Sequence, residues 1–394
     1  GWVVTWMSFL QDGDSWGVYQ QRYDATGTAV GVETRVNDTT IGNQLVPNVA
    51  PLSDGGWVVT WQSDASGTDD IHQKRYDANG AEVSVLTNMF EMFSSGAKNS
   101  TLLATPTTLQ TMDVLFGGEG SDTIRMEAGG TLNLTGMVSG FETLLGSVYA
   151  DTIVTTGALL AQFDMIDGRG ALADPQSRLP GDPVDTLRIG GGGTVSLTGK
   201  TIAVDVIELT DATGTTIAVD DAATALKIDA AAGAADRVDV AADLSIVDVR
   251  ALFANGFEAV SFMREGLQHN ATAVTVGPST QIVDTALDTQ ANLKNWSQST
   301  TIYGPDNLVA QTTVLMDDGW SHTTNYSNGV RTQYVKADMS AGDEISSVVI
   351  NYAADGLTRT DMTTLYDNQD VRTLTYRGGA LATSTFVDVS RSKS

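Results

Sequence analysis

One nine-residue segment combines residue types that can hold a metal ion. It reads Gly-Gly-Glu-Gly-Ser-Asp-Thr-Ile-Arg and covers residues 117–125. Glycines let the backbone turn sharply so that main-chain carbonyls point inward, and Asp122 adds a charged oxygen. The apolar Ile124 then starts a strand that faces a core. Oxygen ligands of this kind suit calcium, so we expect a calcium ion bound by Asp122 and by the carbonyls of Gly118 and Gly120.

A hexapeptide that occurs twice predicts the first of the elements around this segment. Gly-Trp-Val-Val-Thr-Trp stands at residues 1–6 and 56–61, and the related segments QRYDATG and KRYDANG follow at 21–27 and 74–80. Side chains that alternate with a period of two predict strands, and the glycine that ends each related segment supplies a positive φ. Each unit has the size of a propeller blade, and we expect its tryptophans to pack neighbouring units together.

The array GGWVVTWQSD…QRYDANG resembles the repeats of bacterial RTX-type (repeats-in-toxin) exported proteins. This resemblance covers about the first ninety residues, and the loop at 117–125 adds to it. It implies a calcium-binding protein that leaves the cell by type I secretion and acts outside the cell or on its surface. It also implies that calcium lies between two loops about 18 residues apart.

The partner loop does not have that regular spacing here. Eighteen residues after Asp122 comes Gly140, and eighteen residues after Asp113 comes Thr131. The next loop of similar shape ends at Asp151, 29 residues after Asp122. We therefore expect Asp151 or Asp113 to supply the partner carboxylate, and we expect the calcium capacity to be small.

The rest of the chain also alternates short strands with turns. Segments such as TLNLTG and TVSLTG, with many small residues, predict a parallel β-solenoid whose coils cover one another. Residues 244–255 instead have helical spacing and end at Asn255-Gly256, so we expect one helix there. Towards the C-terminus, threonine-rich strands and turns such as residues 326–329 recur about every 50 residues and resemble tyrosine–aspartate (YD-type) repeats.

We therefore predict an all-β protein. Propeller-blade-like repeat units of β-strands come first, a parallel β-solenoid follows, and an array of β-hairpin repeats ends the chain. The predicted boundaries are residues 1–90 for the two repeats, 91–112 for a linker, 113–275 for the solenoid and 276–394 for the hairpins. Because both ends lie inside repeats, we also expect the chain to be a fragment of a longer repeat protein.

Composition excludes several classes of partner. The chain has 48 acidic and 22 basic residues, a net charge of −26, and such a charge repels nucleic acid. It has no cysteine, so it forms neither disulfides nor thiolate metal sites. No apolar run approaches the ~20 residues of a membrane-spanning helix, so we expect no membrane insertion.

No set of residues in the sequence predicts catalysis. The three histidines, His72, His269 and His322, lie in separate segments, and neither a H-E-x-x-H nor a G-x-S-x-G motif occurs. Residues 193–201 resemble a phosphate-binding loop, but Thr194 replaces its first glycine, and the alternation that follows indicates a strand. We therefore expect that this chain is not an enzyme.

Two functions remain open. The first is a calcium-stabilised structural or adhesive protein of the bacterial surface or matrix. It would bind other copies of itself, as a homo-oligomer, filament or layer, or a surface glycan. The alternative is an accessory RTX region of a secreted enzyme or toxin whose catalytic domain lies outside this sequence.

Overall fold

The structure is a computed structural model, and its strand content confirms the predicted all-β class. Strands make up 58% and helices 5%, and the strands form a parallel solenoid of about seven turns with antiparallel sheets at the ends. The chain divides into two compact units, of residues 1–190 with 199–207 and of residues 191–198 with 208–394. The residues described are 1–85, 92–94, 99–109, 113–134, 137–168, 183–230, 235–288, 294–340 and 344–389.

Both hexapeptides form strands of antiparallel sheets, as their alternation predicts. The first repeat holds β1 (Trp2–Phe9), β2 (Trp16–Tyr23) and β3 (Ala29–Arg35). The second repeat holds β4 (Gln44–Pro51), β5 (Trp57–Ser63), β6 (Asp70–Tyr76) and β7 (Glu82–Val85). The turns between the paired strands place Gly27 and Gly80 at φ values of +87° and +90°, which a side chain would disfavour.

The solenoid starts earlier in the chain than the sequence indicated. Residues 91–112, expected to be a linker, include β8 (Met92–Ser94) and β9 (Ser100–Ala104). Strand β9 pairs in parallel with β7 on one side and with β11 (Thr123–Met126) on the other. The second repeat and the first solenoid coils therefore share one continuous sheet.

The coils of the first unit build three parallel sheets. One sheet contains β8, β10 (Val114–Phe116) and β13 (Met137–Ser139). The second contains β9, β11, β14 (Thr143–Leu145), β16 (Met165–Asp167) and β19 (Thr201–Ala203). The third contains β12 (Gly130–Asn133), β15 (Asp151–Thr156) and β17 (Thr186–Gly190). A short helix, α1 (Gly157–Leu160), follows β15.

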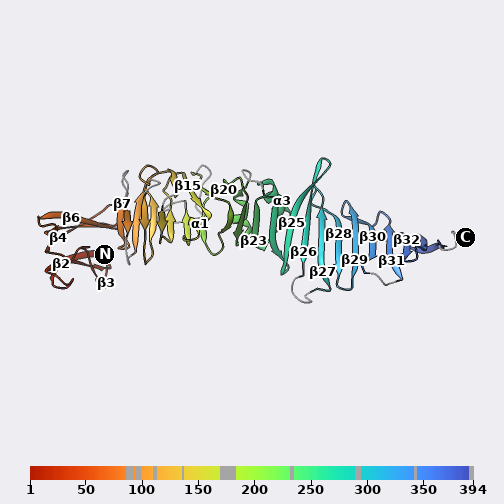
Figure 1. Ribbon diagram of the computed structural model, residues 1–394, viewed down its shortest axis with the longest axis horizontal. Coiled ribbons are helices and arrows are strands. Elements are labelled where there is room, and N and C mark those ends of the chain that lie inside the picture. The colour runs from red at the N-terminus through yellow and green to blue at the C-terminus, as the bar shows by residue number, and fades with distance from the viewer. Residues whose placement is uncertain are drawn as a thin grey trace. The chain divides into compact units, whose positions relative to one another are not determined.

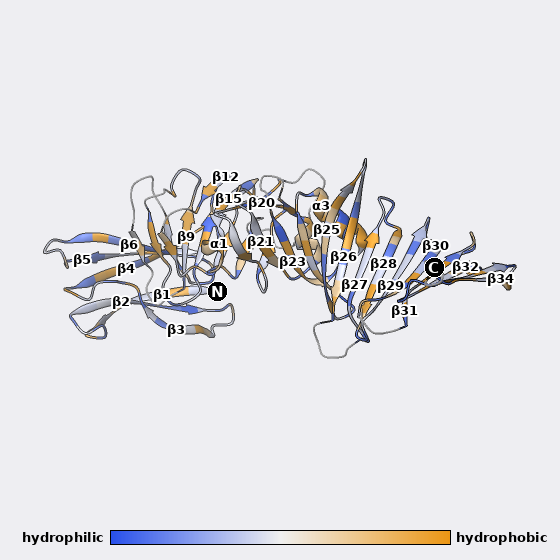
Figure 2. Ribbon diagram, turned by 45° about the vertical axis from the view of Figure 1, so that its right-hand side comes forward, coloured by the Kyte–Doolittle hydropathy of each residue, from blue (hydrophilic) through white to orange (hydrophobic). Residues whose placement is uncertain are grey.

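The core of these coils is a stack of aliphatic side chains in register. Ile124 lies opposite Leu144, and Leu144 lies opposite Ile166, and all three are fully buried. Figure 2 shows the resulting alternation of hydrophobic and hydrophilic residues along the strands. Each coil covers the apolar side chains of the one before it, as the solenoid hypothesis requires.

The second unit also has parallel strands and contains the predicted helix. Its parallel strands are β18 (Gly193–Ser196), β21 (Thr215–Val219), β23 (Arg237–Asp243) and β24 (Ala259–Arg264). The short elements β20 (Val206–Leu209), α2 (Ala222–Leu226) and β22 (Ile228–Asp229) lie among them in the chain. Helix α3 (Ile246–Ala254) lies within the predicted 244–255, and Ser245 and Asp248 form a capping box at its start.

From β24 onward the pairing becomes antiparallel, about nine residues before the predicted boundary at 276. Figure 1 shows the following strands as one row. They are β25 (Leu267–Val276), β26 (Ser279–Leu287), β27 (Trp296–Tyr303), β28 (Val309–Met316), β29 (Trp320–Ser327), β30 (Val330–Asp338), β31 (Ile345–Tyr352), β32 (Arg359–Tyr366), β33 (Val371–Arg377) and β34 (Ala380–Val387). The predicted turn at 326–329 is a hairpin, with Asn328 and Gly329 at φ +50° and +75°, the type I′ pattern.

A row of side-chain amides crosses five strands of this sheet, from β28 to β32. Each member donates a hydrogen bond of 2.7–3.0 Å to the next, and the last acceptor is a carboxylate. The row runs Gln311, Asn325, Gln333, Asn351, Asp361. Residues on both sides of β28 and β29 are mostly half-buried, as expected of a single-layer sheet, and here polar side chains stabilise one another across it.

Candidate functional sites

The three carboxylates predicted as calcium ligands lie at the starts of three different sheets. Asp113 directly precedes β10, Asp122 directly precedes β11, and Asp151 is the first residue of β15. These strands belong to the three separate parallel sheets of the first unit. All three side chains are buried. Each aspartate therefore marks a different corner of the coil.

Asp122 binds the main chain of the neighbouring coils. Its Oδ1 accepts hydrogen bonds from the Ser100 backbone N–H at 2.8 Å and from the Ser100 hydroxyl at 2.6 Å. Its own N–H donates to Oε2 of Glu142 at 2.8 Å, and its carbonyl accepts from the N–H groups of Glu142 and Thr143. The carboxylate of one coil therefore accepts a backbone N–H of the coil before it.

The glycines of the predicted loop have backbone conformations suited to a sharp turn. Gly118 and Gly120 lie at φ +93° and +129°, where a side chain would be strained. At Gly117 the constraint is steric: a Cβ placed on it would lie 1.8 Å from the carbonyl oxygen of Gly140. The three glycines therefore allow both the turn and the close approach of two coils.

Asp151 and the two carboxylates that follow it in the stack repeat this arrangement at another corner. The N–H of Asp151 donates to Oδ1 of Asp185 at 3.0 Å, and the N–H of Asp185 donates to Oδ2 of Asp205 at 2.7 Å. Asp151 also accepts from the N–H of Ser147 at 2.5 Å and from its hydroxyl at 3.1 Å. Burial raises the pKa of Asp151 above its usual range, although the bonds from Ser147 and Gly130 act in the opposite direction.

The second unit contains a third example. Oδ1 of Asp236 accepts from the Thr215 N–H at 2.6 Å, and the Asp236 N–H donates to Oε2 of Glu258 at 2.6 Å. Asp236 is fully buried, and burial raises its pKa, with further contributions from the charges of Glu258 and Asp211. Repetition in both units shows that these carboxylates hold successive coils in register.

A simple sequence signal marks these positions, and most of them lie outside the glycine-rich calcium pattern. An acidic residue stands two positions before a buried Ile, Leu or Val that faces the core. Glu142, Asp185, Asp205 and Glu258 follow this rule but were not predicted as site residues. The segments 167–170 and 233–238 also combine glycine with aspartate, and they lie partly outside the described residues.

The geometry limits what calcium coordination is available. In the described part of the chain, no group of three or more His, Cys, Asp or Glu side chains is placed to hold a metal ion. Asp122, Asp151 and Asp113 stand on three different sheets, and together they do not form such a group. Calcium at residues 117–122 would therefore take most of its oxygen ligands from main-chain carbonyls.

The raised pKa of Asp236 leads to a prediction on pH dependence. A raised folded pKa favours the neutral carboxyl, so this group stabilises the fold below its unfolded pKa and loses that contribution as pH rises through the folded pKa. We expect Asp236→Asn, which keeps an oxygen for the Thr215 N–H, to gain stability relative to wild type as pH rises above about 4, the ordinary pKa of an aspartate. Urea unfolding midpoints at several pH values measure this difference.

Asp355 provides a control of opposite sign in the same unit. Hydrogen bonds from the Thr358 hydroxyl, its N–H and the Leu357 N–H lower the pKa of Asp355. Asp355→Asn should therefore lose stability relative to wild type as pH rises through the acidic range. If both variants follow the wild-type pH profile, the carboxyl of Asp236 titrates normally in the folded protein.

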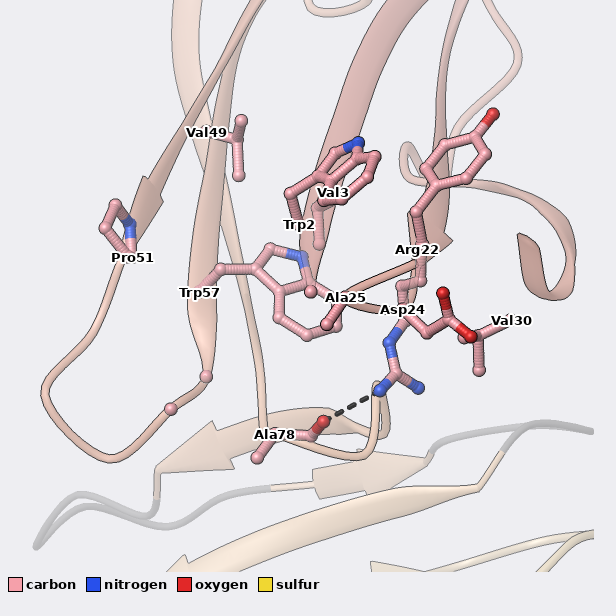
Figure 3. A pocket seen from close by; sticks show the side chains of 14 residues that line it. Trp2, Val3, Arg22, Asp24, Ala25, Val30, Val49, Pro51, Trp57 and Ala78 are labelled. Carbon is pink, nitrogen blue, oxygen red and sulfur yellow. Dashed lines mark hydrogen bonds between the residues drawn. The ribbon is translucent and has the colours of Figure 1, made fainter. Parts of the chain in front are cut away.

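A second candidate site is an open pocket of about 650 Å³ between the two hexapeptide repeats (Figure 3). Trp2, Trp57, Val49 and Pro51 line it, and Arg22 supplies its positive charge. The dashed line in Figure 3 marks the hydrogen bond of 2.8 Å from Arg22 to the carbonyl of Ala78. The predicted packing role of the tryptophans is confirmed for the second repeat, because Trp57 is buried against the first repeat.

Each of the three histidines has its own neighbours. His72 stacks on Trp61, with ring centres 5.6 Å apart, and His322 meets the edge of Tyr334. His269 stacks on Phe262, and its Nδ1 lies 2.8 Å from Oδ1 of Asp284. Each histidine thus packs against an aromatic ring on a neighbouring strand.

Comparison with known proteins finds no matching family model, curated protein or solved structure. Among the described residues, no helix is long and apolar enough to cross a membrane. A functional conclusion therefore depends on the surfaces and sites of this chain alone.

Proposed function

We propose that this chain is an extracellular structural protein that acts by assembling with other copies of itself. The observation that carries the proposal is strand β34 at the edge of the single-layer sheet. It pairs with β33 on one side only, and all eight of its residues are exposed.

The sequence of β34 lacks the usual protection of an edge strand. It reads ALATSTFV, without proline and without a charged residue. Lysine and proline on an edge strand normally hinder pairing with another chain, and β34 has neither; its pairing with β33 has one register shift, at Ala382. Leu381, Phe386 and Val387 are more than half exposed, so pairing would also remove apolar surface from water.

Calcium belongs to the same proposal. Copies with a charge of −26 repel one another, and a divalent cation bound at residues 117–122 would lower that repulsion. A weak site would fill in the millimolar calcium outside a cell and stay empty in the cytosol. Titration calorimetry of the wild type against Glu119→Ala and Asp122→Asn tests whether the ion binds at this loop.

The function is tested by measuring the size of the purified protein. Sedimentation velocity over a range of concentrations, with calcium and with a chelator, should show oligomers that calcium favours. Ser384→Lys places a charge in the middle of β34 and should reduce the oligomers. Thr332→Lys adds the same charge to an exposed position of β30, which is paired on both sides, and should leave them unchanged.

A protein that stays monomeric under all these conditions would exclude self-assembly. Oligomers that Ser384→Lys leaves unchanged would exclude β34 as the contact. Attachment of the monomer to bacterial surfaces or glycans would instead favour an adhesive role for the same chain.

A further inference from the structure

The two hexapeptide repeats present the same residues to different surroundings. In the second repeat, Trp57 and Val59 are 5% and 0% exposed. In the first repeat, the equivalent Trp2 and Val4 are 50% and 43% exposed. We call the side of β1 that carries Trp2, Val4 and Trp6 the aromatic face. The local sequence is identical, so the difference arises from what covers each repeat.

In the second repeat, the equivalent face is the side of β5 that carries Trp57, Val59 and Trp61, and the structure shows what covers it. It is one side of β2, which carries Val18, Gln20 and Arg22. Val18 belongs to the buried cluster of Trp57, Val59 and Trp61. Oε1 of Gln20 accepts from the indole Nε1–H of Trp57 at 2.9 Å.

Arg22 completes the contact between the repeats. Its guanidinium carbon lies 5.4 Å from the centre of the Trp57 ring, a cation–π arrangement. The same side chain donates hydrogen bonds to the carbonyls of Ala78 and Asn79 in the turn of the second repeat. Three alternate residues of β2 thus contact the hexapeptide and its turn: Val18 through apolar packing, Gln20 through its amide and Arg22 through its guanidinium.

The second repeat displays the same three positions on its own uncovered side. Val18, Gln20 and Arg22 correspond, 53 residues later, to Ile71, Gln73 and Arg75 on β6. Ile71 is 78% exposed and Gln73 is exposed, whereas Val18 and Gln20 are buried. We call Ile71, Gln73 and Arg75 the covering face.

We propose that the aromatic face of one copy binds the covering face of a second copy, head to tail. The contact would repeat the one already present inside the chain. Gln73 would accept from Trp2 Nε1–H, whose indole reaches no acceptor among the described residues. Arg75 would lie over the Trp2 ring and donate to the carbonyls of residues 25 and 26. This inference rests on the proposed self-assembly and adds a specific surface to it.

The geometry of this contact determines the kind of assembly. Two different faces meet, so the contact is heterologous: after one contact each copy keeps one free face, and the pair keeps one face of each kind. Arg75 is available for it, because its ion pair with Asp54 at 2.6 Å is partly exposed and such pairs contribute little to stability. Repetition of the contact therefore builds an open chain of copies or a closed ring.

Two single substitutions test the two faces separately. Val4→Asp places a carboxylate on the aromatic face, and Ile71→Asp places one on the covering face. Both positions are solvent-exposed in one copy, so each variant should fold, as circular dichroism would show. We expect each variant to lose the face-to-face contact in sedimentation velocity. Ile41→Asp, at a 67% exposed loop position outside both faces, is the matched control and should assemble as wild type does.

Mixing the two variants distinguishes a head-to-tail contact from a symmetric one. The Val4→Asp copy keeps an intact covering face, and the Ile71→Asp copy keeps an intact aromatic face. We expect the mixture to form a one-to-one dimer that does not grow, while each variant alone stays monomeric. The measurement is made on proteins that also carry Ser384→Lys, so that pairing through β34 does not contribute.

Three results are decisive. Variants that assemble as well as the control, or a mixture that stays monomeric, would overturn the face-to-face contact. If the wild type still forms oligomers that Ser384→Lys removes, the proposed function stands and only this contact is wrong. A wild type that never assembles overturns both.

Discussion

Asp122→Ala should strongly destabilise the first coils of the solenoid. The buried carboxylate accepts two hydrogen bonds from Ser100, and its removal leaves a buried backbone N–H and a buried hydroxyl without that acceptor. Bonds to charged groups contribute about 1.5–3 kcal/mol, and an unsatisfied buried donor adds a comparable cost. We therefore expect the free energy of unfolding to fall by about 3 kcal/mol. Urea unfolding followed by circular dichroism measures it.

Two controls separate this structural role from calcium binding. Asp122→Asn retains an acceptor oxygen for Ser100 and should lose less than half as much stability as Asp122→Ala. Both variants are compared with the wild type in chelator, where a metal ligand has no role. If the difference between wild type and Asp122→Ala disappears in chelator, the carboxylate acts through calcium and not through Ser100.

Gly117→Ala should be at least as damaging, for a steric reason. The added methyl group would lie 1.8 Å from the carbonyl oxygen of Gly140 and 2.7 Å from its carbonyl carbon. Both atoms belong to the backbone of the next coil, so no side chain can rotate away. Overpacking in cores costs about 1–3 kcal/mol, and a contact between two backbones belongs at the top of that range or above it. We expect a lower thermal midpoint or loss of folded protein.

The matched control lies two residues away in the same loop. Glu119 is exposed, and Glu119→Ala removes a charge without adding an atom to the coil contact. In chelator, where calcium binding plays no part, it should leave the thermal midpoint unchanged. Equal midpoints for Gly117→Ala and wild type would show that the coils are further apart than the structure places them.

Local features of the fold could be predicted because local physics determines them. The strand period of the hexapeptides, the positive φ of Gly27 and Gly80, and the helix ended by Asn255-Gly256 all depend on residues close together in the chain. The extent of the solenoid depends on pairing between distant segments. Residues 100–104 form a wholly buried strand, yet a short apolar run does not show which neighbour it joins.

The candidate calcium site could be predicted only in part for a related reason. Its glycines do form a sharp turn, and Asp122 is buried at its end. However, an aspartate can either accept a backbone N–H or bind calcium, and the sequence alone does not distinguish these two roles. The position of Asp122 beside Ser100 and Glu142 follows from coil stacking, which the irregular spacing of the loops conceals.

That irregular spacing has a consequence for how the solenoid tolerates change. Successive hydrogen-bonded positions are separated by 22 residues from Ser100 to Asp122, by 20 from Asp122 to Glu142 and by 34 from Asp151 to Asp185. The carboxylate fixes where each coil begins, so the number of residues between two carboxylates is free to vary. Corners of this solenoid are therefore natural positions for inserting a foreign peptide, and the acidic residue before each strand is the part of the coil to leave intact.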